Sequence, residues 1–146
     1  MKSKLLYESN GLRTFALIFD KGDAVKEKLL EFAASNHFSN VQLTAIGAFS
    51  EVTLGYFERQ RKDYKNIPVK EQVEVLSFAG NIVLKGGKPL LHAHVVVGKS
   101  DGTALGGHFL SGKVWPTLEM VVSELPVQLT RTLDDETGLP LINLAA

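Results

Sequence analysis

The sequence predicts an α+β fold in which one main helix packs on a largely antiparallel β-sheet. Only the segment around residues 23–37 has the apolar spacing of an amphipathic helix. Most of the remaining chain alternates between β-rich segments and short clusters of Gly, Asp, Asn and Pro, which indicate turns. Segments joined by short turns pair antiparallel, and about seven or eight of them are expected.

The chain has the length and composition of one domain with its own core. It contains 146 residues, of which 45% are hydrophobic and 22% are charged. These values are typical of a single globular domain and exclude a disordered chain. No repeat or low-complexity segment interrupts the sequence, so residues 1–146 are expected to form a single domain.

The first expected elements are a strand and the helix. Residues 13–19 are rich in β-forming side chains and end in a cluster of turn formers. Asp23 is expected to cap the helix that follows, because apolar residues recur at helical spacing over Val25–Ala33. The helix is expected to run to about His37, whose side chain would interact favourably with the helix dipole.

The rest of the chain is predicted to be sheet. Residues 41–49 and 52–59 are expected to form a hairpin, in which Gly47 and Gly55 mark bulges or close backbone approach. The polar stretch 60–66 is expected to be an exposed loop. Further strands are expected at 71–84, 90–98, 103–110 and 118–125, followed by a β-like stretch at 127–133 and an apolar tail at 139–144.

Charge and composition exclude several classes of site. Sixteen Lys and Arg balance sixteen Asp and Glu, so an extended basic surface for nucleic acid is not expected. The lack of cysteine excludes disulfides, thiol nucleophiles and Cys-based zinc or iron–sulfur sites. No segment resembles a signal-peptide core or a membrane span, and we expect a cytoplasmic protein without membrane contact.

Three of the four histidines lie close together in the sequence, at His92, His94 and His108. On a strand, His92 and His94 point to the same face, with Cα atoms roughly 7 Å apart. The register of the following strand decides whether the third histidine joins them. A two-residue turn sets His94 opposite Phe109 and splits the histidines between two faces, whereas a three-residue turn ending at Gly102 sets His94 opposite His108.

Side-chain volumes favour the three-residue turn, because it sets Val95 against Gly107 and Ala93 against Phe109, large against small in both pairs. Three imidazoles on neighbouring strands match the ligand number of a Zn²⁺, Ni²⁺ or Fe²⁺ site with an open position. The alternative is that the histidines are polar residues of a half-exposed sheet face or of a subunit interface.

Glu119 lies inside an apolar strand segment, where burial of its carboxylate is costly unless it is paired. It is a candidate to orient a ligand histidine or to complete a metal sphere. The alternative is that its strand face is simply exposed. The chain has no Gly-x-Ser-x-Gly motif, and hydrolysis by an activated serine therefore has no support.

A series of short motifs occurs in order along the chain. They are Arg13-Thr-Phe-Ala-Leu, Ala45-Ile-Gly-Ala, Val52-Thr-Leu-Gly-Tyr-Phe, Glu74-Val-Leu-Ser, Leu91-His-Ala-His, Asp101-Gly and Gly106-Gly-His. Together they resemble the PPC domain, the "plants and prokaryotes conserved" domain, in its stand-alone prokaryotic form. The resemblance covers about residues 10–125 and leaves 126–146 as a C-terminal extension.

The resemblance implies a homotrimer and a metal site at His92, His94 and His108, with zinc as the first candidate. Plant members carry AT-hooks beside the domain, but this chain lacks the Arg-Gly-Arg-Pro core, so DNA binding does not transfer with the fold. The expected function is a DNA-binding or regulatory homotrimer that contacts DNA or a protein partner weakly. The alternative is a metal-dependent enzyme acting on a small molecule, with a metal-bound water as nucleophile.

Overall fold

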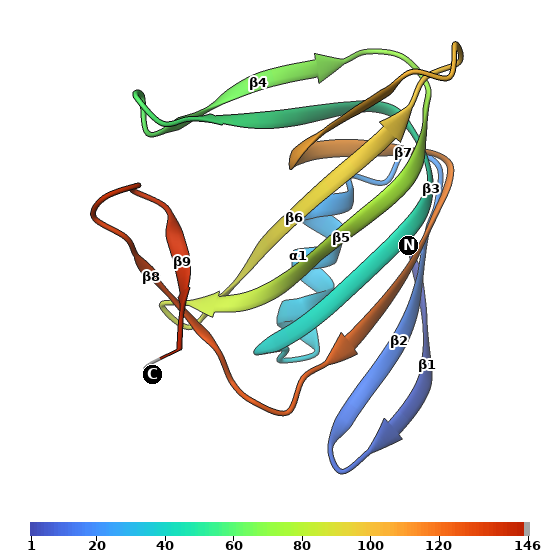
Figure 1. Cartoon of the computed structure of the whole chain (residues 1–146). Helices are drawn as coiled ribbons and strands as arrows, with labels where there is room; N and C mark the ends of the chain where they lie inside the picture. Colours follow the sequence, from blue (N-terminus) through green and yellow to red (C-terminus); the bar gives the residue numbers. More distant parts are fainter. Residues whose placement is uncertain (145–146) are drawn as a thin grey trace.

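The sheet and helix of the computed structural model confirm the α+β fold class (Figure 1). The structure describes residues 1–144, which form a nine-stranded sheet and one helix, α1. The strands pair in the order β1-β2-β7-β3-β5-β8-β9, while β4 pairs with β3 and β6 pairs with both β5 and β7. The bounds are β1 Lys2–Ser9, β2 Leu12–Phe19, α1 Val25–Ser35, β3 Asn40–Glu58, β4 Asp63–Val69, β5 Val73–Lys85, β6 Lys88–Gly98, β7 Ala104–Glu124, β8 Thr130–Leu133 and β9 Pro140–Asn143.

The core lies between α1 and one face of the sheet. Val25, Leu29 and Ala33 form the apolar stripe of α1, and all three are fully buried. They belong to one cluster with buried side chains of the sheet, among them Phe15 and Leu17 of β2. Burial of this stripe accounts for the helix at the predicted place. No helix within residues 1–144 has the length and apolarity needed to cross a membrane.

The helix begins differently from the expectation. Asp23 does not cap it, because Ala24 holds the N-cap position without a side-chain hydrogen bond. The Asp23 carboxylate instead accepts the backbone N–H of Asp20 at 2.9 Å and pairs with the N-terminal ammonium at 2.8 Å. The reason is β1, which the sequence did not indicate and whose pairing with β2 carries the amino terminus to this point. The helix ends at Ser35, and His37 follows it with a left-handed φ of 56°.

Two pairs of predicted strands are single long strands. The hairpin predicted between 41–49 and 52–59 is wrong, because β3 runs through both segments, and β7 likewise joins the two strands expected over 103–125. The pairing of β3 with β7 shifts register between Gly47 and Glu51 and again after Thr53. The turn-forming residues within these segments, such as Gly47, therefore mark bulges, which bend a strand without reversing the direction of the chain.

The segment after residue 125 forms a hairpin at the edge of the sheet. β9 pairs antiparallel with β8, and β8 contacts β5 through one parallel pair, Leu84 with Thr130. The β-like stretch and the apolar tail of the sequence are thus the two arms of this hairpin, which lies beside the start of β6 in Figure 1. The exposed loop predicted at 60–66 is shorter than expected, because β4 begins at Asp63 and pairs with β3.

Candidate metal centre

The turn between β6 and β7 sets the register on which the site depends. It is the three-residue turn favoured by the sequence: the Lys99 N–H donates to the Thr103 carbonyl at 2.9 Å, and Gly102 takes a left-handed φ of 83°. His94 consequently lies opposite His108, and the next pairs follow in the same register. Of the two pairs in which a large side chain was expected opposite a small one, Val95 lies opposite Gly107 as predicted, whereas Phe109 pairs with Leu54 of β3 and not with Ala93.

His92, His94 and His108 converge on one point. The three ring centroids are 5.3, 5.3 and 5.4 Å apart, and one nitrogen from each ring lies within 4.8 Å of the others. The Nε2 atoms of His92 and His94 are 3.3 Å apart. Two nitrogens bound tetrahedrally to one zinc ion at about 2.0–2.1 Å would be about 3.3–3.4 Å apart, so this pair already has the spacing of metal ligands.

Tyr64 of β4 supports His108 from the side. The two rings stack with centroids 4.4 Å apart, and the phenol oxygen lies 3.5 Å from Nδ1 of His108. Gly55 of β3 makes room for this contact, because a Cβ there would lie 2.8 Å from Cδ1 of Tyr64. Tyr64 was not a candidate from the sequence, since it lies in a stretch interpreted as an exposed loop.

Arg131 of β8 reaches the cluster from the other side. Its guanidinium lies 3.3 Å from Nδ1 of His92 and donates to the Asn81 side-chain oxygen at 2.8 Å and to the Pro140 carbonyl at 2.8 Å. Arg131 is only 6% exposed. No pattern in the sequence associates it with the histidines, from which it is separated by more than twenty positions.

Burial keeps protons off two of the histidines. Burial, reinforced by the nearby His92, His94 and Lys26, lowers the pKa of His108 to about 4. Burial also lowers the pKa of His92, with smaller contributions from Arg131 and His94. At neutral pH both rings are uncharged, so each has one ring nitrogen without a proton.

Glu119 lies elsewhere. It is exposed on β7, in register with Ile18 of β2 and Ile46 of β3. It is not a member of the histidine cluster, so the structure does not bring it together with the predicted ligands. The exposed-face alternative from the sequence describes its position.

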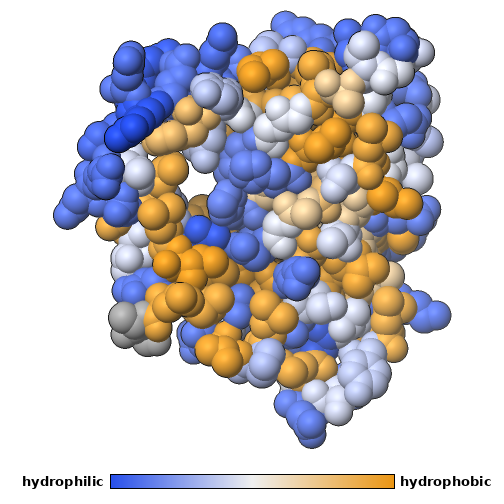
Figure 2. Space-filling view, in the orientation of Figure 1, coloured by the Kyte–Doolittle hydropathy of each residue, from blue (hydrophilic) through white to orange (hydrophobic). Residues whose placement is uncertain are grey.

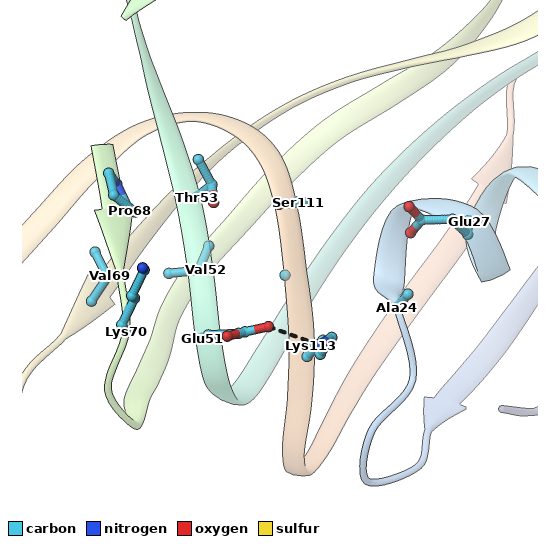
Figure 3. Close-up of a pocket in the computed structure, with 11 residues that line it drawn as sticks. Ala24, Glu27, Glu51, Val52, Thr53, Pro68, Val69, Lys70, Ser111 and Lys113 are labelled. Carbon is cyan, nitrogen blue, oxygen red and sulfur yellow. Dashed lines mark ion pairs between the residues drawn. The ribbon is translucent and has the colours of Figure 1, made fainter. Parts of the chain in front are cut away.

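A separate hollow lies between the start of α1 and the strands β3, β4 and β7 (Figure 3). Its volume is about 230 Å³, and its charged lining residues are Glu27, Glu51, Lys70 and Lys113. Glu51 and Lys113 form an ion pair at 2.9 Å. Mixed charges that pair with one another are typical of a solvated surface, and this hollow contains no histidine.

Known proteins share both the sequence pattern and the fold. The model of the Plants and Prokaryotes Conserved (PCC) domain matches residues 7–126. A plant- and prokaryote-conserved (PPC) protein from Pyrococcus horikoshii is 29% identical with a TM-score of 0.85, over 97% of this chain and 94% of that one. A metal-containing protein from Archaeoglobus fulgidus is 33% identical with a TM-score of 0.83, over 97% and 98% of the two chains.

A third structure, of a candidate DNA-binding protein from Bacteroides thetaiotaomicron, is 26% identical with a TM-score of 0.87, over 99% of both chains. No curated protein matches the chain. The family match spans most of the sequence and includes all three clustered histidines. The chain therefore belongs to the Plants and Prokaryotes Conserved domain family, abbreviated PCC or PPC.

Proposed function

We propose that this protein is a homotrimer that binds one divalent metal ion per chain through His92, His94 and His108, with zinc as the first candidate. The observation that carries the proposal is the convergence of three imidazoles from two neighbouring strands. The metal-containing relative from Archaeoglobus fulgidus supports it. Three imidazole nitrogen donors with an open fourth position form a site in which a divalent ion would polarise a bound water or ligand.

The surroundings of the donors fit a metal ion. The Tyr64 hydroxyl lies 3.5 Å from Nδ1 of His108, so if Nε2 held a metal ion, Nδ1 would carry the proton and this hydroxyl could accept its hydrogen bond and orient the ring. Arg131 acts in the opposite direction, because its guanidinium can only donate and favours the His92 tautomer with its proton on Nε2. A metal ion on that nitrogen competes with this proton, so Arg131 is expected to weaken metal binding.

The face of the sheet away from α1 supports the homotrimer. Ile46 is 61% exposed and Leu76 is 55% exposed, and Ile18, Val96 and Val121 are exposed beside them. Figure 2 shows hydrophobic surface over the region where β5 begins and β6 ends. An apolar patch on the open face of a sheet is typical of a subunit interface. Closed threefold symmetry would cover this patch in every chain.

A regulatory role with weak contact to DNA or protein completes the proposal. One relative is a candidate DNA-binding protein, but the formal net charge of this chain is zero. Within the basic loop, Arg61 pairs with Glu58 at 3.0 Å and Lys62 donates to the Asp135 carbonyl at 3.2 Å. The pairing of Arg61 reduces the positive charge of this loop, and with a net charge of zero over the chain binding to DNA should be weak and independent of sequence.

Elemental analysis of untagged protein tests the metal proposal. We expect about one divalent ion per chain, with zinc as the first candidate, and the triple variant His92→Ala, His94→Ala, His108→Ala should contain none. The variant His37→Ala is the matched control, because it removes the fourth histidine outside the cluster. Equal metal content in the triple variant and the native protein would overturn the proposal. Light scattering should give three times the chain mass of 16.0 kDa.

A further inference from the structure

A small pocket adjoins the histidine cluster. Its volume is about 160 Å³, and its polar wall is formed by Lys26, Tyr64, His92, His108 and Arg131. The rest of its lining is apolar and consists of leucines of β6 together with residues 139–141 of the C-terminal hairpin. Figure 2 shows an opening between this hairpin and the rest of the molecule, with hydrophobic surface beside it. The pocket is smaller than the usual 300–1,000 Å³ of small-molecule sites, so its ligand must be small.

The buried guanidinium of Arg131 lacks an acidic partner among the described residues. Its hydrogen bonds go to neutral groups, the oxygens of Asn81 and Pro140 and Nδ1 of His92, and its Nε has no partner within residues 1–144. Burial lowers the pKa of Arg131, which reflects the cost of holding a cation away from water. A buried charge is normally paired, because an uncompensated one is strongly destabilising.

A second cation faces the same pocket. Lys26 of α1 lines it, and its ammonium is close enough to lower the pKa of His108 after the effects of burial and of His92 and His94. No ion pair of Lys26 occurs within the described chain. The polar wall thus has two cationic side chains, next to donors that would hold a divalent cation, and no carboxylate. A bound anion would therefore pair with these two cations.

We propose that this pocket binds a small aliphatic carboxylate, whose anionic group lies between Arg131 and Lys26 and whose short chain lies against the leucines. This inference rests on the proposed metal site, because the carboxylate would also reach the open position of the metal ion. The apolar wall distinguishes it from inorganic phosphate, which has no group to place there.

The C-terminal extension determines the selectivity of the pocket. Arg131 and residues 139–141 lie beyond residue 126, where the match to the family ends. The metal ligands lie within the matched region. The matched region therefore supplies the metal ligands, Lys26 and the leucines of β6, and the β8–β9 hairpin adds Arg131 and the apolar residues 139–141.

The test is calorimetric titration of butyrate into protein loaded with Co²⁺, with the visible spectrum of the cobalt ion recorded in parallel. We expect one butyrate per chain and a change in the cobalt spectrum. Affinity should fall about fourfold for each methylene removed on going from butyrate to acetate. Butyramide, which has the same chain without the charge, should not bind detectably, and phosphate should bind more weakly than butyrate.

Variants locate the binding groups. Arg131→Gln and Lys26→Gln should each weaken butyrate binding at least about tenfold, while both still bind one Co²⁺ per chain. Arg61→Gln is the matched control, since it removes an arginine that is 67% exposed, and butyrate binding should be unchanged. If Arg131→Gln fails to fold, as judged by circular dichroism, Lys26→Gln decides alone.

The outcomes separate the two proposals. Failure of the native protein to bind Co²⁺ would overturn the proposed metal site. Titration of butyrate into metal-free protein would then still test whether Arg131 and Lys26 bind the carboxylate. Equal binding of butyrate and butyramide would overturn the carboxylate pocket, as would native-like butyrate affinity in Arg131→Gln and Lys26→Gln. Tighter binding of phosphate than of butyrate would overturn the assignment of the apolar wall.

Discussion

Acid should release metal from this site at lower pH than from three ordinary imidazoles. A free imidazole with a pKa of about 6.5 loses about tenfold in metal affinity between about pH 7.5 and 5.5, and three lose about 1,000-fold. The pKa of His108 is lowered to about 4, first by burial, so protons barely compete at this ligand over that range. Relative to three ordinary imidazoles, protection of His108 lowers the expected fall from about 1,000-fold to about 100-fold, and burial, which also lowers the pKa of His92, lowers it further.

The measurement is competition for Zn²⁺ against a chelator of known affinity at each of the two pH values. The expected fall in affinity is below about 100-fold, by the proton-competition argument. The variant His37→Ala should give the same pH dependence as the native protein, because His37 lies outside the cluster. A fall of about 1,000-fold or more would show that all three imidazoles titrate freely, and would refute the inference that burial protects His108.

Three further substitutions test an ion pair of the sheet, a close contact beside the histidines and the proposed subunit interface. Glu124→Gln should lower the free energy of unfolding in urea by about 1.5–3 kcal/mol near neutral pH. The Arg13 guanidinium donates to this carboxylate at 2.7 and 2.8 Å and lowers its pKa from the ordinary value of 4.5. The difference should therefore shrink below pH 4.5 and vanish once the pH falls through the lowered pKa. Gly55→Ala should cost about 1–3 kcal/mol by overpacking and weaken metal binding, whereas Gly106→Ala should do neither, because a Cβ there meets nothing nearer than 3.5 Å. Ile46→Glu should convert the proposed trimer to a 16.0 kDa monomer in light scattering, while Val127→Glu, at a 65% exposed position, should have the same mass in solution as the native protein.

The histidine cluster could be predicted because its geometry is local. His92 and His94 share a face by strand periodicity alone, and the register of His108 depends only on a short turn. The pairing of Val95 with Gly107 provided a second constraint on the register, because it sets a large side chain opposite a small one. Two independent local rules therefore led to one arrangement.

The pocket beside the cluster could not be predicted, because its residues arrive through long-range pairings. Tyr64 approaches only because β4 pairs with β3 and because Gly55 has no side chain. Arg131 approaches through a single parallel contact of β8 with β5. A contact of that kind has no periodicity in the sequence. The same limit explains the error at Asp23, whose partner is the chain terminus.

The position of the cluster follows from the way β7 changes partners. β7 pairs with β6 up to the His94–His108 pair and lies against β3 from His108 onward, with Gly55 opposite His108. His108 therefore belongs to both pairings, and the first half of β6, from Lys88 to Ala93, has no β7 partner within the described chain. Through this open edge, the side chains of α1, β4 and β8 reach the histidines. In a regular sheet the same three histidines would form only a polar surface patch. The pocket beside them exists because β6 and β7 diverge.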